Sequence, residues 1–338
     1  MTVGVGIVGG GFWARLIHVP AFQRIPGYRV VGVASRRPEV GQQFATEFNL
    51  PKAFASADEL IADPDVDIVD ILVPNDLHKP IALAAFAAGK DVMVIKPLAR
   101  NLSESREIVE AAERLGRKIY YAENVPFIPA LAALKSLVDA GTYGRVFRIK
   151  CLHGTPGPHA AWFSDPQRAG GGAVMDMAVH GLGWLQWMMD GAQPTEVFAA
   201  TGTFVHDYPV EDTSVMILRY DNGSMAQSED CWSIPAGFDS RYEIFGTKGH
   251  AFADLLYGHP IRSILGGNPE GGANAVSFHA INDHVEKDGH IAMFQHFLDC
   301  ITTGAPCRST GRDGLRIMEI VEAVYRSVES GRSEPIPA

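Results

Sequence analysis

A run of three glycines directly after a short apolar segment constrains this chain more than any other feature. Residues 3–8 are apolar and are followed by Gly9, Gly10 and Gly11. Such a run is typical of a strand buried on both faces of a parallel sheet, and consecutive glycines allow a tight turn into the next element. We therefore expect a strand, a turn and a helix at the start of the sequence.

The turn also has the spacing of a dinucleotide-binding loop. Gly9, Gly11 and Ala14 satisfy the pattern G-x-G-x-x-G/A. The first glycine permits the tight turn, the second lets the backbone approach a pyrophosphate, and the small third residue lets the helix pack closely on the sheet. We predict a nicotinamide dinucleotide here, with Phe12 and Trp13 of the loop among its contacts.

Strand and helix patterns alternate through the first 122 residues. Strands are expected at 3–8, 29–34, 68–73, 91–95 and 118–122, and helices at 12–24, 38–48, 80–88 and 103–115. Strands separated by helices of about ten residues imply βαβ crossovers. Residues 1–122 are thus predicted to form an α/β Rossmann domain with a doubly wound parallel sheet.

The pattern changes after residue 122. Helices are expected at 129–140, 173–190, 292–303 and 313–330, a strand at 145–152, and hairpins at 213–232 and 240–255. Asn222 and Gly223 suit the turn of the first hairpin because both tolerate positive φ. Residues 123–338 are thus predicted to form a second, α+β domain with a large, mostly antiparallel open sheet.

Composition excludes several classes of protein. The chain is 46% hydrophobic and 20% charged, which is too apolar for a disordered protein. Its 338 residues are enough to form two domains. The net charge of −10 makes nucleic acid an unexpected partner, and no apolar run approaches the ~20 residues of a membrane span. Four cysteines without C-x-x-C spacing, and no secretion signal, indicate reduced thiols in a cytoplasmic protein.

The end of the second strand bears on the choice of cofactor. A dinucleotide fold that prefers NAD has an acidic residue there, which bonds the ribose 2′-hydroxyl. This chain has Ser35, Arg36 and Arg37 instead. A hydroxyl and two guanidinium groups can bind a 2′-phosphate with charge-assisted bonds, so NADP is predicted over NAD. The alternative is that one or both arginines, Arg37 in particular, are merely solvated at a loop tip.

Polar residues follow two later strands, at the edge where such sheets bind ligands. Pro74, Asn75 and His78 come after one strand, and Lys96 and Pro97 after the next. We expect these residues to line the cofactor site.

A glycine-rich segment in the second domain leads into a helix with two chemically active side chains. Asp176 and His180 follow Gly170, Gly171 and Gly172 and are four residues apart. In a helix, residues at this spacing share one face, so both side chains can point into one cleft.

In combination, these segments resemble the glucose-fructose oxidoreductase, inositol dehydrogenase and MocA family (Gfo/Idh/MocA) over nearly the whole chain. The family pairs the glycine loop with P-N-x-x-H, E-K-P, N-x-x-F-x-P and G-G-G-x-x-x-D-x-x-x-H segments, and residues 124–129, from Asn124, fit the fourth. The resemblance implies a Rossmann domain followed by an α+β domain whose open sheet serves dimer or tetramer contacts. It also implies redox chemistry on sugars, inositols or related polyols, with Asn124 near the cofactor.

The resemblance assigns catalytic roles to three residues. Lys96 is similar to the lysine that orients substrate, His180 to the catalytic histidine and Asp176 to its partner. Elementary chemistry agrees, because removing hydride from a carbinol carbon requires a base for the hydroxyl proton, and histidine suits that role at neutral pH. Lys96 can stabilise the developing alkoxide. One departure is Ile95, where the family has glutamate, so any role of that carboxylate is absent.

Other interpretations stay open at this point. Asp176 and His180 could ligate a metal with His153 or His159, although no third ligand is dictated by spacing and hydride transfer needs none. His159 and Trp162 are predicted substrate contacts, with simple loop packing as the alternative. A glycoside-cleaving enzyme that uses transient oxidation, or a non-catalytic cofactor-binding sensor, are alternatives to a dehydrogenase or reductase.

Overall fold

The computed structural model describes residues 2–189, 191–235, 237–255, 261–266, 275–279 and 289–337. The chain forms two compact units. Unit 1 comprises Met1–Glu123, Gln167–Gly170 and His290–Met318, and unit 2 comprises Asn124–Pro166, Gly171–Gly289 and Glu319–Ala338. Two segments beyond residue 122 therefore pack with the N-terminal unit, which a division of the sequence at a single point does not anticipate.

Unit 1 is built on a six-stranded parallel sheet of order β3-β2-β1-β4-β5-β6. The strands are β1 Val3–Val8, β2 Tyr28–Ala34, β3 Lys52–Phe54, β4 Ile68–Ile71, β5 Asp91–Ile95 and β6 Ile119–Ala122. The helices are α1 Val19–Arg24, α2 Pro38–Glu47, α3 Ala57–Ala62, α4 His78–Ala87, α5 Leu102–Leu115 and α9 His290–Thr303. The predicted doubly wound sheet is confirmed, and its strand order reverses between β1 and β4, where such folds bind ligands.

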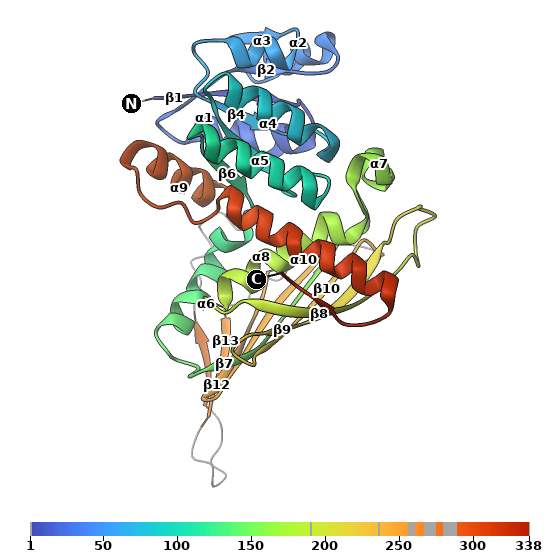
Figure 1. Ribbon diagram of the computed structural model, residues 1–338. Coiled ribbons are helices and arrows are strands. Elements are labelled where there is room, and N and C mark those ends of the chain that lie inside the picture. Colours follow the sequence, from blue (N-terminus) through green and yellow to red (C-terminus); the bar gives the residue numbers. More distant parts are fainter. Residues whose placement is uncertain are drawn as a thin grey trace. The chain divides into compact units, whose positions relative to one another are not determined.

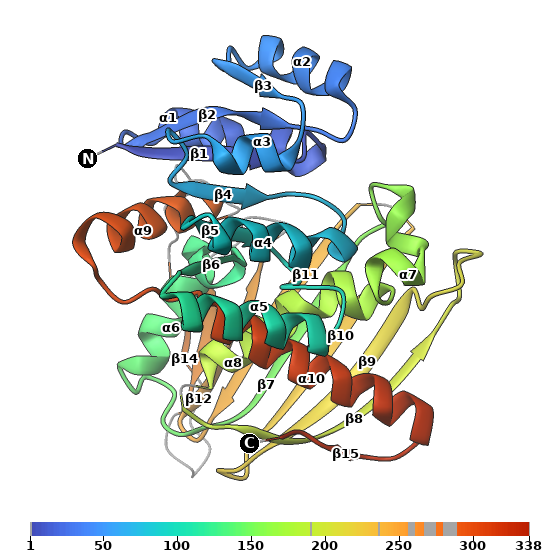
Figure 2. The same cartoon turned by 45° about the horizontal axis from the view of Figure 1, so that its top comes forward.

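Local signals explain where several of these elements begin and end. All six residues of β1 are buried, as expected of a central strand. The Asn101 side chain accepts the Glu104 N–H at the start of α5, and Gly116 at its end adopts φ of 64°. Helix α4 packs on β4 and β5 and beside α5, as Figure 2 shows.

Unit 2 contains a nine-stranded sheet of order β14-β13-β12-β11-β7-β10-β9-β8-β15. The strands are β7 Val146–Gly154, β8 Pro194–Gly202, β9 Thr213–Tyr220, β10 Met225–Cys231, β11 Asp239–Gly246, β12 Gly249–Asp254, β13 Ile261–Leu265, β14 Ala275–His279 and β15 Glu334–Pro335. Neighbouring strands are antiparallel except for β10 and β7, which are parallel. This confirms the mostly antiparallel sheet and both predicted hairpins.

Helices of unit 2 lie on one face of that sheet. Helix α6 spans Pro129–Asp139, α8 spans Val179–Met188, and α10, Gly311–Ser330, runs from unit 1 into unit 2. Helix α8 packs on β7 and β10 (Figure 1). Buried and exposed residues alternate along β9, as expected when only one face of a sheet is covered.

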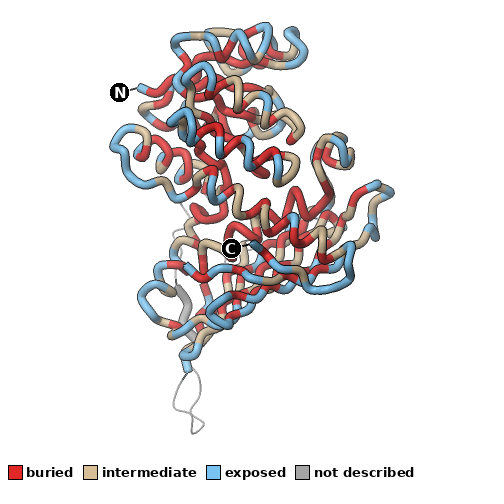
Figure 3. The backbone as a smooth tube through the Cα atoms, in the orientation of Figure 1, coloured by how far each residue is buried: buried red, intermediate tan, exposed pale blue. Residues whose placement is uncertain are grey.

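Figure 3 shows the buried residues in the interior of each unit and the exposed ones along outer helix faces and turns. Within the described part of the chain, no helix combines the length and apolarity required to cross a bilayer. A short helix, α7, covers Pro166–Ala169.

Candidate active site

The glycine loop has the shape that a pyrophosphate requires. Gly9 adopts φ of 109°, and a Cβ there would lie 2.2 Å from the Leu72 carbonyl oxygen, so only glycine fits. A Cβ at Gly11 would meet nothing within 4 Å, which leaves open space beside the backbone. Ala14 is fully buried under the helix that follows. These observations fit a dinucleotide bound against the loop and the helix N-terminus.

The second strand brings Ser35 to the same edge of the sheet. Strands β1 and β2 are paired, and the Gly9 N–H donates to the Ala34 carbonyl at 2.9 Å. Ser35 is half-buried, and Arg36 and Arg37 are exposed. Neither arginine forms an ion pair with any residue that the structure describes, so both guanidinium groups can receive an anion.

Two buried side chains hold the neighbouring loops. The Asn75 amide donates to the Ala169 carbonyl at 2.8 Å. The fully buried His78 ring places Nε2 2.9 Å from the Val73 carbonyl oxygen and Nδ1 3.1 Å from that of Pro97. Burial lowers the pKa of His78, while its hydrogen bonds to the Val73, Leu98 and Pro97 carbonyl oxygens act in the opposite direction. We interpret His78 as a residue that fixes the segments following β4 and β5 relative to each other.

Lys96 lies at the carboxyl end of β5, between the loops that follow β4 and β6. The residue is 9% exposed, an unusual degree of burial for lysine, which is seldom found so far from solvent without a partner. The Lys96–Pro97 peptide bond is cis. Asn124 follows β6 after Glu123 and is half-buried.

The helix that carries Asp176 and His180 does not begin as a regular α-helix. Residues Val174–Ala178 form a π-helical turn that continues into α8, and a second π turn, Ala14–His18, follows the glycine loop. Such turns are rare and occur often at functional sites. Asp176 is buried and His180 is partly exposed. The sequence predicts the helix and the spacing but not the wider turn.

Asp176 is held by a residue from the distant end of β10. The indole Nε1 of Trp232 donates to Asp176 Oδ2 at 2.9 Å, and Trp232 is fully buried. Trp232 also packs in a cluster with Phe163 and Met177. Asp176 therefore has a fixed carboxylate orientation within unit 2.

A buried polar network lies next to His180. The His153 ring centroid is 6.1 Å from that of His180. His153 Nε2 is hydrogen-bonded to the Tyr242 hydroxyl, and its Nδ1 lies 3.5 Å from Asp230 Oδ1. Asp230 Oδ2 accepts the Ser228 hydroxyl at 2.6 Å. His153 and Asp230 meet because they are directly opposite each other on the paired strands β7 and β10.

Gly181 lets α8 approach this network. A Cβ at Gly181 would lie 2.5 Å from Ser228 Oγ and 3.2 Å from Asp230 Oδ1. A larger residue would move α8, and with it His180, away from the sheet.

The aromatic loop after β7 packs beside the Trp232 cluster. The Trp162 ring stacks on Phe163 with centroids 3.8 Å apart, and His159 meets Phe163 edge to face at 4.8 Å. Trp162 is partly buried and His159 is exposed. Both predicted substrate contacts thus adjoin the cluster that anchors Asp176.

Several residues of the site were missed from the sequence. Trp232, Asp230 and Tyr242 follow no linear motif, and their roles depend on strand register. His153 was considered only as a metal ligand, and its contact with Asp230 likewise depends on strand register. The alternation of β10 was the one available signal, because it places Ser228 and Asp230 on the buried face of the sheet.

Known proteins share both units of this chain. Residues 3–123 match the GFO/IDH/MocA oxidoreductase family, NAD-binding Rossmann fold, and residues 131–252 match the GFO/IDH/MocA C-terminal domain. Trans-1,2-dihydrobenzene-1,2-diol dehydrogenase of Mus musculus is 33% identical over 255 residues, 75% of this chain and 74% of its own. The 1,5-anhydro-D-fructose reductase of Ensifer adhaerens is 28% identical over 341 residues, 98% of each chain.

A solved structure shows the same similarity in three dimensions. GenD2 from gentamicin A biosynthesis, in complex with NAD, is 28% identical and aligns with a TM-score of 0.88, covering 100% of this chain and 97% of GenD2. The similarity therefore extends over both units.

Proposed function

This chain belongs to the GFO/IDH/MocA family of oxidoreductases, with an NAD-binding Rossmann domain at residues 3–123, and from that premise we propose a specific reaction. The chain transfers a hydride between a nicotinamide dinucleotide and a carbinol or carbonyl carbon of a sugar, sugar derivative or cyclitol. The observation that carries the proposal is the pairing of Trp232 with Asp176 one turn before His180. Asp176 supplies a buried, oriented carboxylate and His180 a partly exposed imidazole, and such a pair is suited to general acid–base catalysis.

His180 is the proposed general acid/base. In the oxidising direction its imidazole accepts the hydroxyl proton of the substrate, and in the reducing direction it returns a proton to the alkoxide oxygen. Asp176 orients a substrate hydroxyl or the imidazole itself. His153, backed by Asp230 and Tyr242, supports His180 from the sheet side. The bound nicotinamide supplies or accepts the hydride.

Lys96 is proposed to assist from the Rossmann domain. Its ammonium group would stabilise negative charge that develops on the reacting oxygen of the substrate. Without a glutamate at position 95, the charge of Lys96 is not offset by the residue before it.

The proposed cofactor is NADP, with NAD as the alternative. Support comes from Ser35 at the edge of the glycine loop and from the exposed Arg36 and Arg37. Gly9, Gly11, Phe12, Trp13 and Ala14 are proposed to hold the pyrophosphate, and the remaining contacts are proposed for Pro74, Asn75, Lys96, Pro97 and Asn124, with His78 as the buried support of those loops.

The proposed substrate is small and rich in hydroxyl groups. The relatives named above act on a cyclic diol and on an anhydro sugar. In this chain, His159 offers an exposed hydrogen-bonding ring and Trp162 an aromatic face that can stack on a sugar.

We also propose that the chain forms a homodimer or homotetramer through the outer face of the sheet in unit 2. Phe198, Val215, Ile217 and Met225 are each 41–48% exposed there, and Phe198 lies directly opposite Ile217 on the paired strands β8 and β9. A contiguous exposed apolar patch of this kind marks an interaction surface. Light scattering should give a dimer or tetramer, and Ile217→Glu should reduce its mass, whereas a wild-type monomer contradicts the proposal.

The reaction is tested with a panel of sugars, cyclitols and glycosides. Each is incubated with oxidised NADP or NAD, and reduced cofactor is followed by its absorbance. We expect net reduction with at least one polyol. Release of an aglycone without net reduced cofactor would instead identify a glycoside-cleaving enzyme, and no turnover in either assay would identify a sensor.

A further inference from the structure

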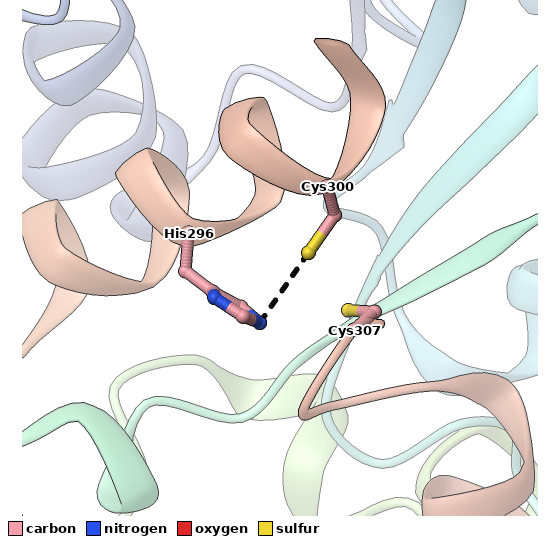
Figure 4. A group of neighbouring side chains, drawn as sticks. All are labelled: His296, Cys300 and Cys307. Atoms are coloured by element: carbon pink, nitrogen blue, oxygen red, sulfur yellow. Dashed lines mark hydrogen bonds between the residues drawn. The ribbon is translucent and has the colours of Figure 1, made fainter. Parts of the chain in front are cut away.

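A histidine and two cysteines of unit 1 lie together at the end of α9 (Figure 4). His296 and Cys300 are four residues apart on α9 and share one face. Cys307 follows after a turn in which Gly304 adopts φ of 75°. One ligand atom from each of the three residues lies within 4.8 Å of the other two.

The distance between His296 and Cys300 matches that between two ligands of a tetrahedral metal site. Zinc binds sulfur at about 2.3 Å and imidazole nitrogen at about 2.0 Å, which puts the two ligand atoms about 3.5 Å apart. His296 Nε2 and Cys300 Sγ are 3.5 Å apart in the structure. Two cysteines with one histidine form a soft ligand set that suits zinc.

The His296 nitrogen nearest Cys300 accepts a backbone hydrogen bond. The Arg308 backbone N–H donates to His296 Nε2 at 3.0 Å, so this nitrogen is unprotonated, and a metal ion bound at Nε2 would have to displace that hydrogen bond.

The third ligand is anchored to a different element from the first two. Cys307 precedes Ser309, whose carbonyl accepts the Tyr121 N–H at 3.1 Å and whose hydroxyl donates to the Tyr121 carbonyl at 2.6 Å. Tyr121 lies in β6, at the edge of the Rossmann sheet. Cys300 is buried, while His296 and Cys307 are partly exposed and leave a route from solvent.

We propose that His296, Cys300 and Cys307 bind one divalent metal ion of the zinc class, which links α9 to the segment beside β6. The Cys300 thiol now faces the Pro306 carbonyl and the Cys307 thiol faces the Ser309 carbonyl. Binding of one Zn²⁺ displaces the two thiol protons to solvent, and no electrons are transferred. Water or the Pro306 carbonyl oxygen, 3.5 Å from Cys300 Sγ, completes the coordination.

Cobalt tests the proposal, because a cobalt–thiolate bond absorbs in the near ultraviolet and a tetrahedral site gives intense visible bands. Co²⁺ is titrated into the full-length, tag-free protein under a non-thiol reductant. We expect one equivalent to bind with both features, and Zn²⁺ to bleach them. Cys300→Ser and Cys307→Ser should each lose most of the charge-transfer intensity. Cys231→Ser, a partly exposed cysteine of unit 2, is the matched control and should bind like wild type.

A second experiment measures how much the bound metal stabilises the fold. Ligands that bind only the folded state raise the melting temperature, so Zn²⁺ should raise Tm of the wild type and of Cys231→Ser but not of Cys300→Ser. Absence of the charge-transfer band in the wild type, or its persistence in both cysteine variants, overturns the proposal. If those variants do not fold, X-ray absorption of the zinc-loaded wild type decides: two sulfurs and one imidazole support the site, and oxygen and nitrogen ligands alone refute it.

Discussion

The indole of Trp232 donates a hydrogen bond of 2.9 Å to the carboxylate of Asp176, and both side chains are buried. Trp232 follows the end of β10, whereas Asp176 lies in the π turn before α8. A buried carboxylate is costly unless its oxygens are hydrogen-bonded. This bond therefore stabilises the carboxylate and fixes its direction one turn before His180.

Replacing Trp232 with Phe tests how much this hydrogen bond contributes to the free energy of unfolding. We expect the variant to lose about 1–3 kcal/mol of unfolding free energy in urea titrations, because a buried carboxylate oxygen loses its donor. The substrate KM should rise as the carboxylate loses its orientation. Trp184→Phe is the matched control, since the Trp184 indole N–H is buried without a hydrogen-bond partner among the described residues. Equal losses in stability in the two variants would mean that the bond contributes nothing.

His180→Ala tests the proposed base. We expect turnover to fall about 10²–10⁴-fold, the usual contribution of a positioned general base, while cofactor affinity stays near that of the wild type. Steady-state kinetics and fluorescence titration with reduced cofactor measure the two quantities separately. Turnover close to the wild-type rate would remove His180 from the mechanism.

Ser35→Asp tests the cofactor preference. A carboxylate at this position repels a 2′-phosphate and can bond the ribose hydroxyl, so the ratio of affinities should shift toward NAD. Arg36→Ala should weaken NADP without affecting NAD, and Arg37→Ala shows whether the second guanidinium also takes part. Tighter binding of NAD than of NADP by the unmodified protein would contradict the preference.

Gly181→Ala tests the close packing beneath His180. The new Cβ meets Ser228 Oγ at 2.5 Å, so we expect a loss of about 1–3 kcal/mol in stability and a decrease in kcat as α8 shifts. Gly41→Ala in α2 is the control, because its Cβ would find only ordinary contact, 3.5 Å from Ser35 Cβ. That variant should be neutral or slightly stabilised, as alanine favours helix. A neutral Gly181→Ala would show that the network tolerates displacement.

Two adjacent carboxylates should respond to pH in opposite directions. Burial raises the pKa of Glu211, and its N–H donors at Gly172 and Val174 counteract this only partly. Although burial opposes it, the backbone N–H groups of residues 204–206 lower the pKa of Asp212. Ionisation of Glu211 therefore lowers the free energy of unfolding as pH rises from the ordinary glutamate pKa to the raised pKa of the native state. Ionised Asp212 raises the free energy of unfolding, and this contribution is lost as pH falls from the ordinary aspartate pKa to the lowered pKa of the native state.

Urea titrations across pH measure this contrast. The stability of Glu211→Gln relative to wild type should increase with pH above the ordinary glutamate range. That of Asp212→Asn should decrease as pH rises through the acidic range and then stay level. Parallel curves for the two variants would show that the surroundings of these carboxylates do not differ as described.

Sequence patterns predicted the frame of the fold because they reflect local chemistry. The buried run before Gly9, the glycine-terminated helices and the hairpin turn at Gly223 all depend on neighbours within a few residues. The strand β3 was missed because three residues carry too little periodicity. The six residues of α3 were missed for the same reason.

The sequence alone determined the dinucleotide loop and the spacing of Asp176 and His180, since both follow from φ preferences and helix periodicity. Only the tertiary structure decided what surrounds them. Trp232 reaches Asp176, and His153 meets Asp230, through strand register and packing between segments far apart in the chain. The cluster at His296 was equally hidden, because Cys307 approaches Cys300 through a turn and a pairing with β6 rather than through a metal-binding spacing. Contacts of this kind depend on how whole elements pack, which no short stretch of sequence encodes.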